Sequence, residues 1–330
     1  MGTLTDETLA GILEGPRARG AFLLRSVLNP PWALRIEDRA PLSLATLISG
    51  EAWITYDDGE PARIRPGEIA IMRGPDPYTV ADSPTTPPDI VIHPGQVCTT
   101  TQGENLWDAM SFGVRSWGDG PEGSTVMLTG TYQMHSAIGR RLLGALPALL
   151  VRPAGEGDRG LISLLGEEMS RSDPGQELVL DRILDLLLVR VLRSWLASPG
   201  AGAPAWYRAQ HDPVVGPALR MLHSDPARPW TLPDLAAEIG VSRAGLARRF
   251  TSMVGEPPMS YLTGWRLALA ADLLCEPEMT IGAVARQVGY GSSFALSAAF
   301  KRVRGLSPQE HRRTAATRPR PFTGDTADEA

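Results

Sequence analysis

Residues 288–312 read VGYGSSFALSAAFKRVRGLSPQEHR, and this stretch decides the fold of the C-terminal third of the chain. Thr280 and Ser292 can each cap the start of a helix, and Gly289 suits the tight turn between the two helices. Apolar residues recur at helical spacing on both sides of that turn. The second helix ends in the basic residues Lys301, Arg302 and Arg304. The stretch therefore predicts a helix-turn-helix whose second helix has a basic end.

The same unit occurs about 50 residues earlier, in TLPDLAAEIGVSRAGLARRFTSMV, residues 231–254. Thr231 and Ser242 are the expected caps, and Gly240 can take the left-handed turn. Between the two units, residues 258–276 read as one long amphipathic helix. A single helix-turn-helix is a moderate signal, because any small helical bundle uses such turns. Two copies joined by a connecting helix are much stronger.

The two copies resemble the DNA-binding domain of the AraC/XylS family of bacterial transcription regulators. The resemblance covers about residues 212–313 and is carried by LAAEIGVSRAGLARRF and GYGSSFALSAAFKRVRGLSPQEHR. It implies an all-α domain in which the second helix of each unit lies in the major groove. The two grooves are then successive on one face of the DNA, roughly 34 Å apart.

The resemblance also implies which residues face the DNA. Arg248 matches a position that the family uses to touch bases, and an arginine there contacts guanine best. Ala298 stands where many relatives carry arginine, so the second unit should read bases weakly and hold phosphate through its basic end. The alternative for that end is a solvated basic surface. The expected DNA-contacting residues are Arg243, Ala244, Ala247, Arg248, Arg249, Ser292, Ser293, Ser297, Lys301, Arg302 and Arg304.

Other residues of this region are expected in the core. Leu246, Phe250 and Val254 define the core face of the first recognition helix, and Arg243 and Arg249 are interpreted as phosphate contacts. The remaining expected core residues are Trp265, Cys275, Tyr290, Phe294, Phe300 and Leu306.

Residues from about 20 to 100 are typical of β structure. Short apolar runs such as WALRI, LATLIS, EAWITY, ARIR and EIAIM alternate with turns such as DDGE, RPGE and GPDP. Such spacing predicts a sandwich or barrel. Helices are predicted at about 136–150, 161–170 and 177–195, and the last is apolar on more than one face. A helix of that kind needs two packing partners, either both within one subunit or one from a second copy.

The β-rich segment, about residues 20–135, resembles the cupin-like sensor domains attached to many AraC/XylS regulators, with Gly50, Gly59, RPGE and RGPDPY as landmarks. Metal-binding cupins place histidines where this chain has Ser43, Ala45 and Tyr78. We therefore expect no metal and no cofactor, which argues against a cupin enzyme.

A barrel of this kind could hold a small organic effector. The candidate lining residues, each of which also suits ordinary packing, are Trp32, Trp53, Tyr56, Met72, Arg73 and Tyr78. Cys98 is a candidate sensor thiol if its thiolate is favoured, or else an inert thiol in the barrel wall. By residue type alone, His93 and His135 could join Cys98 in a metal site, although their spacing is not diagnostic.

The charge is unevenly distributed along the 330 residues. Residues 212–320 hold 14 Lys and Arg against 9 Asp and Glu, whereas the whole chain has a formal net charge of −5. This asymmetry fits a polyanion-binding module on an acidic partner domain. The start of the chain lacks the pattern of a signal peptide, and the long apolar run of a membrane span is missing, so we expect a cytoplasmic protein.

These observations predict an α+β protein of two domains. Residues 1–196 form a cupin-like β-barrel with flanking helices that binds an effector and pairs subunits. Residues 197–211, rich in Gly, Pro and Ala, are a linker; residues 212–316 are the double helix-turn-helix domain; and residues 317–330 are a disordered tail.

The preferred function is a ligand- or thiol-responsive transcription regulator that acts as a homodimer. Its partners are promoter DNA, a small-molecule effector and RNA polymerase, with no membrane. The alternatives are a cupin-type enzyme with an accessory helical domain and a helical adaptor that binds protein.

Overall fold

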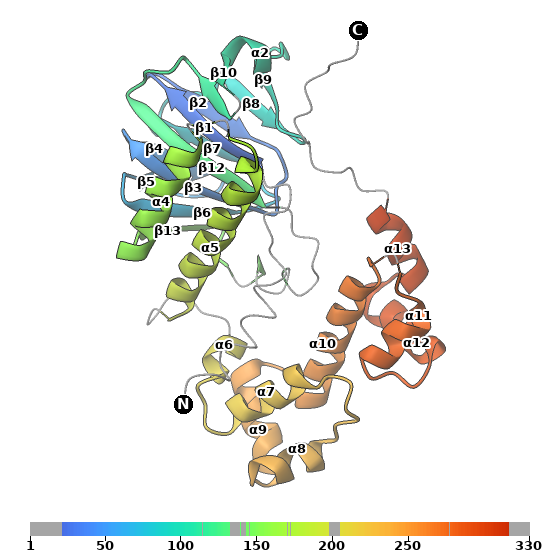
Figure 1. Cartoon of the computed structure of the whole chain (residues 1–330). Helices are drawn as coiled ribbons and strands as arrows, with labels where there is room; N and C mark the ends of the chain where they lie inside the picture. The colour runs from blue at the N-terminus through green and yellow to red at the C-terminus, as the bar shows by residue number, and fades with distance from the viewer. Residues whose placement is uncertain are drawn as a thin grey trace. The chain divides into compact units, whose positions relative to one another are not determined.

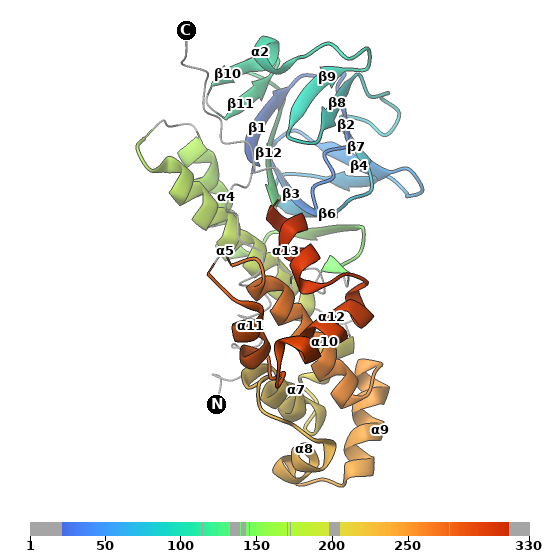
Figure 2. The same cartoon turned by 90° about the vertical axis from the view of Figure 1, so that its right-hand side faces the viewer.

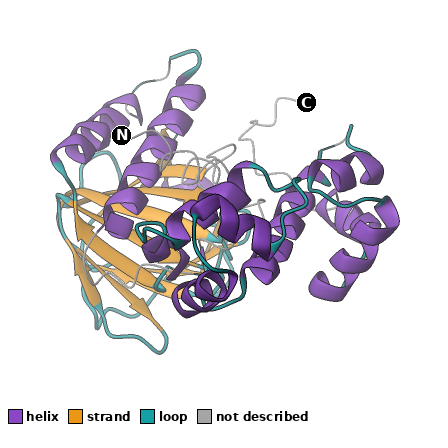
Figure 3. Ribbon diagram, turned by 90° about the horizontal axis from the view of Figure 1, so that it is seen from below, coloured by secondary structure: helices purple, strands orange, loops and turns teal. Residues whose placement is uncertain are grey.

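The computed structural model describes residues 22–113, 115–132, 139, 143–144, 146–169, 171, 173–197, 205–276 and 278–316. These residues fall into two compact units. One unit holds the strands, helix α4 (Glu156–Met169) and most of α5 (Gln176–Ala197), and the other holds the helices from α6 onward. Figure 3 distinguishes the orange strands of the first unit from the purple helices. The predicted combination of a β-rich and an all-α domain is confirmed.

The β-rich unit contains two sheets that do not close into one barrel (Figure 1). A seven-stranded sheet has the order β10-β11-β1-β12-β3-β6-β13, and a six-stranded sheet has the order β5-β4-β7-β2-β8-β9. Their strands are β1 (Phe22–Leu28), β2 (Ala33–Ile36), β3 (Leu42–Ser49), β4 (Ala52–Tyr56), β5 (Ala62–Ile64), β6 (Glu68–Arg73), β7 (Tyr78–Ala81), β8 (Ile90–His93), β9 (Val97–Thr100), β10 (Ser111–Gly113), β11 (Ser116–Gly118), β12 (Thr125–Tyr132) and β13 (Leu149–Pro153), with the short helix α2 (Trp107–Met110) before β10.

The core of this unit lies between the sheets. Leu47 and Met127 come from the seven-stranded sheet, and Leu34, Ile54 and Val80 from the six-stranded sheet, and all five are buried in one cluster. Side chains alternate along a strand, so the alternate apolar residues of both sheets meet there. This alternation is the pattern that the sequence shows.

Helix α5 packs on β12 of the seven-stranded sheet. The Tyr132 hydroxyl donates a hydrogen bond to the carbonyl of Leu184 at 2.9 Å. Gly130 permits this close approach, because a Cβ there would lie 2.8 Å from a methyl carbon of Leu184. Helix α4 is tied to α5 by an ion pair between Asp158 and Arg190.

The helix predicted over residues 136–150 is corrected at its end. Leu149 and Leu150 lie in β13, which pairs with β6 in antiparallel register. A short apolar run in a half-buried edge strand cannot be distinguished from a helix segment by its periodicity alone. Most of residues 136–145 lie outside the described part of the chain, as does the predicted tail 317–330.

The second unit is helical. Its elements are α6 (Ala205–Ala209), α7 (Val215–Ser224), α8 (Leu232–Ile239), α9 (Arg243–Val254), α10 (Pro258–Leu273), α11 (Ile281–Gln287), α12 (Ser293–Arg304) and α13 (Pro308–Ala316). Helix α6 falls within the segment interpreted as a linker, and Ala209 is fully buried in the core of the first helix-turn-helix. The Gly/Pro stretch therefore gives way to folded structure before residue 212.

The predicted capping of both helix-turn-helix units is confirmed. Thr231 and Ser242 accept backbone N–H groups of α8 and α9 at 3.3 and 3.1 Å. Thr280 and Ser292 do the same for α11 and α12, both at 3.1 Å. The turn between α11 and α12 requires Gly289, whose φ is 82° and whose Cβ, if present, would lie 2.7 Å from the carbonyl oxygen of Ala227.

Two residues expected in the core are exposed. Phe294 is 81% exposed. Leu296, two positions later and about 200° around the helix, is buried, so Phe294 points to the opposite side, toward solvent. Cys275 follows the buried Leu274 at the end of the α10 segment, and it is exposed as well. No helix among the described residues is long and apolar enough to span a membrane.

Candidate DNA interface and effector pocket

Helix α10 joins the two helix-turn-helix units. Phe250 of α9 packs edge-on against Tyr261 of α10, with ring centroids 5.7 Å apart. At the other end, the Arg312 guanidinium donates to the carbonyl of Leu274 at 3.0 Å, and His311 lies 3.1 Å from the carbonyl of Ala271. Figure 2 shows α11 and α12 beside α10. The His311 ring, on α13, also packs edge-on against Phe300 of α12, with centroids 5.4 Å apart. Helix α9 is thus held at one end of α10, and α12 is held at the other end through α13.

Helix α9 presents a basic face to solvent. Leu246 and Phe250 are fully buried, as predicted, and they turn Arg243, Ala244 and Arg248 outward. Among the described residues, neither Arg243 nor Arg248 has an ion-pair partner. Ala247 is half-buried beside this face. The face can supply a bidentate guanidinium without breaking an existing contact.

Arg249 is engaged inside the domain instead of projecting freely. Its Nη2 donates to the Asp212 carboxylate at 2.6 Å, and its Nε is shared between the two carboxylate oxygens at 3.0 Å each. Arg249 holds the pKa of Asp212 below its usual range. Asp212 also accepts the backbone N–H groups of Val214 and Val215 at the start of α7. The expected phosphate contact from Arg249 would therefore have to compete with an ion pair that ties α9 to α7.

Helix α12 presents hydroxyls at its start and positive charge at its end. Ser292 and Ser293 are exposed, and Ser297 is half-buried. Lys301 and Arg302 are exposed on the last turn, whereas the Arg304 guanidinium lies 5.5 Å from the centre of the Phe300 ring. The exposed charges sit where phosphate contacts are expected.

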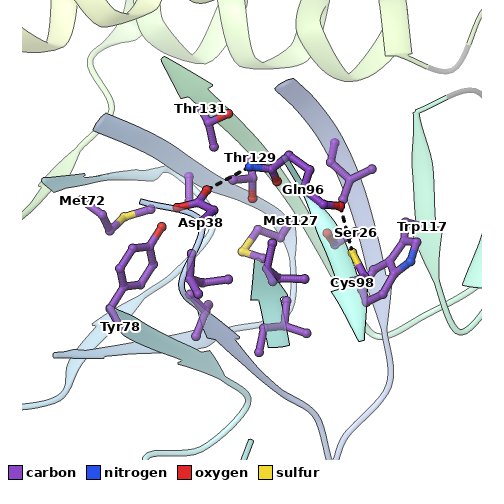
Figure 4. A pocket seen from close by; sticks show the side chains of 16 residues that line it. Ser26, Asp38, Met72, Tyr78, Gln96, Cys98, Trp117, Met127, Thr129 and Thr131 are labelled. Atoms are coloured by element: carbon purple, nitrogen blue, oxygen red, sulfur yellow. Dashed lines mark hydrogen bonds between the residues drawn. The ribbon is translucent and has the colours of Figure 1, made fainter. Parts of the chain in front are cut away.

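A pocket lies between the two sheets of the β-rich unit (Figure 4). The space open to the centre of a water-sized sphere is about 50 Å³, several times the roughly 10–15 Å³ that one water needs. The lining residues come from both sheets and from the loops after β2 and β8: Leu24, Ser26, Leu34, Ile36, Asp38, Ala45, Met72, Tyr78, Val80, Ile92, Gln96, Cys98, Trp117, Met127, Thr129 and Thr131. The wall is mostly apolar with a few polar groups, which is the composition of small-molecule sites.

The charged group of the pocket is Asp38. The Gln96 side-chain amide donates to its carboxylate at 2.9 Å, as Figure 4 shows, and the backbone N–H of Ala40 donates at 2.9 Å. Gln96 has a φ of 63°, an unusual conformation for a residue other than glycine, which costs free energy and is often found at functional sites. A carboxylate has room for further donors beyond these two.

The structure brings some of the predicted effector residues to the pocket. Met72 and Tyr78 line it. Trp32 is buried in the core but does not line the pocket. The Trp53 side chain lies on the opposite face of β4 from the buried Ile54, and its ring centre is 5.8 Å from the Arg63 guanidinium.

Two further candidates, Tyr56 and Arg73, lie outside the lining of the pocket. The Tyr56 hydroxyl lies 3.0 and 2.9 Å from the carbonyl oxygens of Arg73 and Ala148 and can donate its one proton to either, and its ring packs 5.4 Å from Tyr78. Arg73 has its Nε buried and unbonded among the described residues, and it lies outside the lining. Asp38, Gln96 and Thr129 were not predicted. The only sequence signal for Gln96 is its place in the HPGQV turn.

Cys98 lines the pocket but is buried, and its thiol lies 3.6 Å from the carbonyl oxygen of Gln96. Burial raises the pKa of Cys98 to about 11, so its thiolate is disfavoured at neutral pH. His93 is hydrogen-bonded to Thr99 at 2.9 Å, and His135 lies outside the described residues. No cluster suited to a metal is found in the part of the chain that the structure describes.

The architecture defines a class of protein: a cupin domain followed by a helix-turn-helix domain, as in DNA-binding transcription regulators. The cupin family matches residues 7–197, and the helix-turn-helix domain family matches residues 235–314. A putative AraC-like transcription regulator of Streptomyces lividans is 31% identical over 312 residues, covering 93% of this chain and 98% of that protein.

The chain therefore belongs to the AraC-like transcription regulators. The HTH-type transcriptional regulator AlkR of Acinetobacter baylyi is 28% identical over 287 residues, covering 85% of this chain and 90% of that protein. The DNA-binding domain of AdpA, solved with a target DNA, is 30% identical and covers 31% of this chain and 92% of that chain. The TM-score of that comparison is 0.29. Domains and relatives indicate a regulator and not an enzyme.

The two cysteines should differ sharply toward a thiol reagent. We expect one rapidly reacting thiol in the native protein, Cys275, because it is exposed, and one that reacts only after unfolding, Cys98. Timed reaction with a chromogenic disulfide reagent measures both. The Cys275→Ser variant should lose the rapid phase and the Cys98→Ser variant should keep it. A rapid phase that persists in Cys275→Ser would reinstate Cys98 as a sensor thiol.

Proposed function

We propose that this regulator binds promoter DNA through α9 and α12 and that a small molecule in the pocket between the sheets controls this binding. The observation that carries the proposal is the pair of capped recognition helices joined by α10, of which α9 has an exposed basic face and α12 an exposed basic end. Residues 1–196 serve effector binding and dimerisation, and residues 212–316 serve DNA binding. The protein works in the cytoplasm, where its promoter is, and RNA polymerase is a further partner.

A homodimer is part of the proposal. Helix α5 buries one side on β12, yet Leu178, Val179 and Leu186 of the same helix are 68%, 42% and 48% exposed. Val179 and Leu186, seven residues apart, share one side of the helix, and Leu178 lies within about 100° of both, so the three form an apolar stripe around the exposed Arg182. Covering the stripe by a second copy of the chain would supply the second packing partner that the composition of α5 calls for.

The pocket favours an effector with a small apolar body and one hydrogen-bond donor or positive charge. Asp38 is the negative group at the wall, and the other polar atoms come mainly from hydroxyls and the Gln96 amide. An anionic ligand would bring two negative charges together in a poorly solvated space, which is unfavourable. By linkage, an effector that changes DNA affinity must itself bind differently when DNA is present.

The first test is DNA recognition by Arg248. A binding site is first selected from random DNA with the wild-type protein. Arg248→Ala should then weaken binding to that site by about 1–3 kcal/mol, roughly 5- to 150-fold, and relax the preference at one base pair. Titrations of labelled DNA at several salt concentrations measure this effect.

Arg249→Ala is the matched control for this test. It removes the neighbouring guanidinium that pairs with Asp212, so it should lower thermal stability and leave base preference unchanged. Equal losses on selected and random DNA for Arg248→Ala would refute base reading. A wild-type protein without salt-dependent DNA affinity would favour the helical adaptor instead.

The second test concerns the charge preference of the pocket. Small primary amines should raise the melting temperature of the protein, and carboxylic acids with the same carbon skeleton should not, because of Asp38. Thermal melts with matched amine and acid pairs measure the difference. A neutral alcohol with the same carbon skeleton is included in each set. In Asp38→Asn the advantage of the amines over the acids should disappear, and the alcohols should still bind. Stronger stabilisation by the acids would contradict the assignment.

A further inference from the structure

Phe294 is the most exposed of the large apolar side chains among the described residues, at 81%. Single exposed apolar residues are common on protein surfaces and usually need no explanation. This one stands in the first turn of a recognition helix, directly after the capping Ser292 and the exposed Ser293. Its position is what calls for an explanation.

The side chain lies on the face of α12 that is expected to meet DNA. Leu296, Ala299 and Phe300 are buried and define the opposite face. Positions four and seven residues later on a helix share a stripe. Phe294 therefore shares its stripe with Ala298 and Lys301, the latter an exposed cation suited to phosphate.

The start of a recognition helix is the part that reaches base edges in the major groove. A phenylalanine side chain there has no hydrogen-bond donor or acceptor, so it cannot recognise the polar atoms of a base edge. The apolar group on a base edge in that groove is the 5-methyl group of thymine, which apolar side chains contact. The small Ala298, one turn later, leaves the ring room to approach it.

We propose that Phe294 is a specificity-determining residue that contacts a thymine 5-methyl group in the half-site bound by α12. The inference rests on the proposed DNA-binding function. It gives α12 a way to recognise a base although Ala298 stands at the position where many relatives carry arginine.

The test removes the methyl group and nothing else. In the selected site, each thymine of the α12 half is replaced singly by deoxyuridine, which keeps the base pair intact. The α12 half is the one whose base preferences do not change in Arg248→Ala. Wild-type affinity should fall about three- to fivefold at one replacement, which corresponds to losing the burial of one methyl group.

Phe294→Ala should bind the thymine and deoxyuridine sites with equal affinity at that position. Val303→Ala is the matched control, because Val303 is an exposed apolar residue (55%) of the same helix at its far end. It should keep the wild-type sensitivity. Circular dichroism melts of both variants should match the wild type, since neither side chain is buried.

Two results with the wild type or with Phe294→Ala would overturn the inference and leave the proposed function standing. One is specific binding by the wild type without any loss on thymine replacement, and the other is a Phe294→Ala variant that keeps the loss. A wild-type protein that selects no DNA sequence at all would refute the proposed function, and this inference would fail with it. Loss of the sensitivity in Val303→Ala as well would show a general effect on α12 and would also contradict the assignment.

Discussion

The attachment of both recognition helices to α10 is the constraint on which the DNA-binding half of this protein depends. A helix of 16 residues spans about 24 Å and bends little. Phe250 packs on Tyr261 near its start, and Arg312 bonds the carbonyl of Leu274 past its end. Arg312 belongs to α13, whose His311 ring packs against Phe300 of α12. Because these contacts are buried or half-buried, α9 and α12 cannot change their separation without breaking them.

At this fixed separation, the two recognition helices can contact different base pairs of one DNA site by different kinds of interaction. Helix α9 offers Arg248, a hydrogen-bonding reader, and α12 offers an apolar side chain followed by Lys301 and Arg302. The base excess of the chain is confined to the C-terminal third, whereas the rest is acidic. Long-range attraction to DNA is therefore concentrated on the helical domain.

Local sequence rules predicted the helical domain well. The four caps, the turn glycines and the core faces are fixed by interactions within a few residues, so their pattern can be found in the sequence. Phe294 and Arg249 could not be placed in this way. The exposure of Phe294 depends on which side of α12 the domain core covers, and Arg249 finds Asp212 only after α7 and α9 have packed together.

The β-rich domain was predictable as a class but not in its site. Alternating apolar runs indicated strands, yet the order of the strands and the separation into two sheets depend on long-range pairing. The polar end of the pocket brings together Asp38 and Gln96, which are hydrogen-bonded although they lie 58 positions apart in the sequence. No spacing rule connects two such loops. The run that ends at Leu150 fits a helix as well as a strand, because so short an apolar run has no period that separates the two.

The most direct test of the account is the affinity of the protein for DNA whose half-sites are moved apart. Starting from the selected site, 5 or 10 base pairs are inserted between the positions read by α9 and α12, about half a turn and one full turn. A rigid α10 predicts that both insertions reduce binding to the level of a single half-site. Affinity that is unchanged by either insertion would contradict the account, because it would mean that the two helix-turn-helix units move independently.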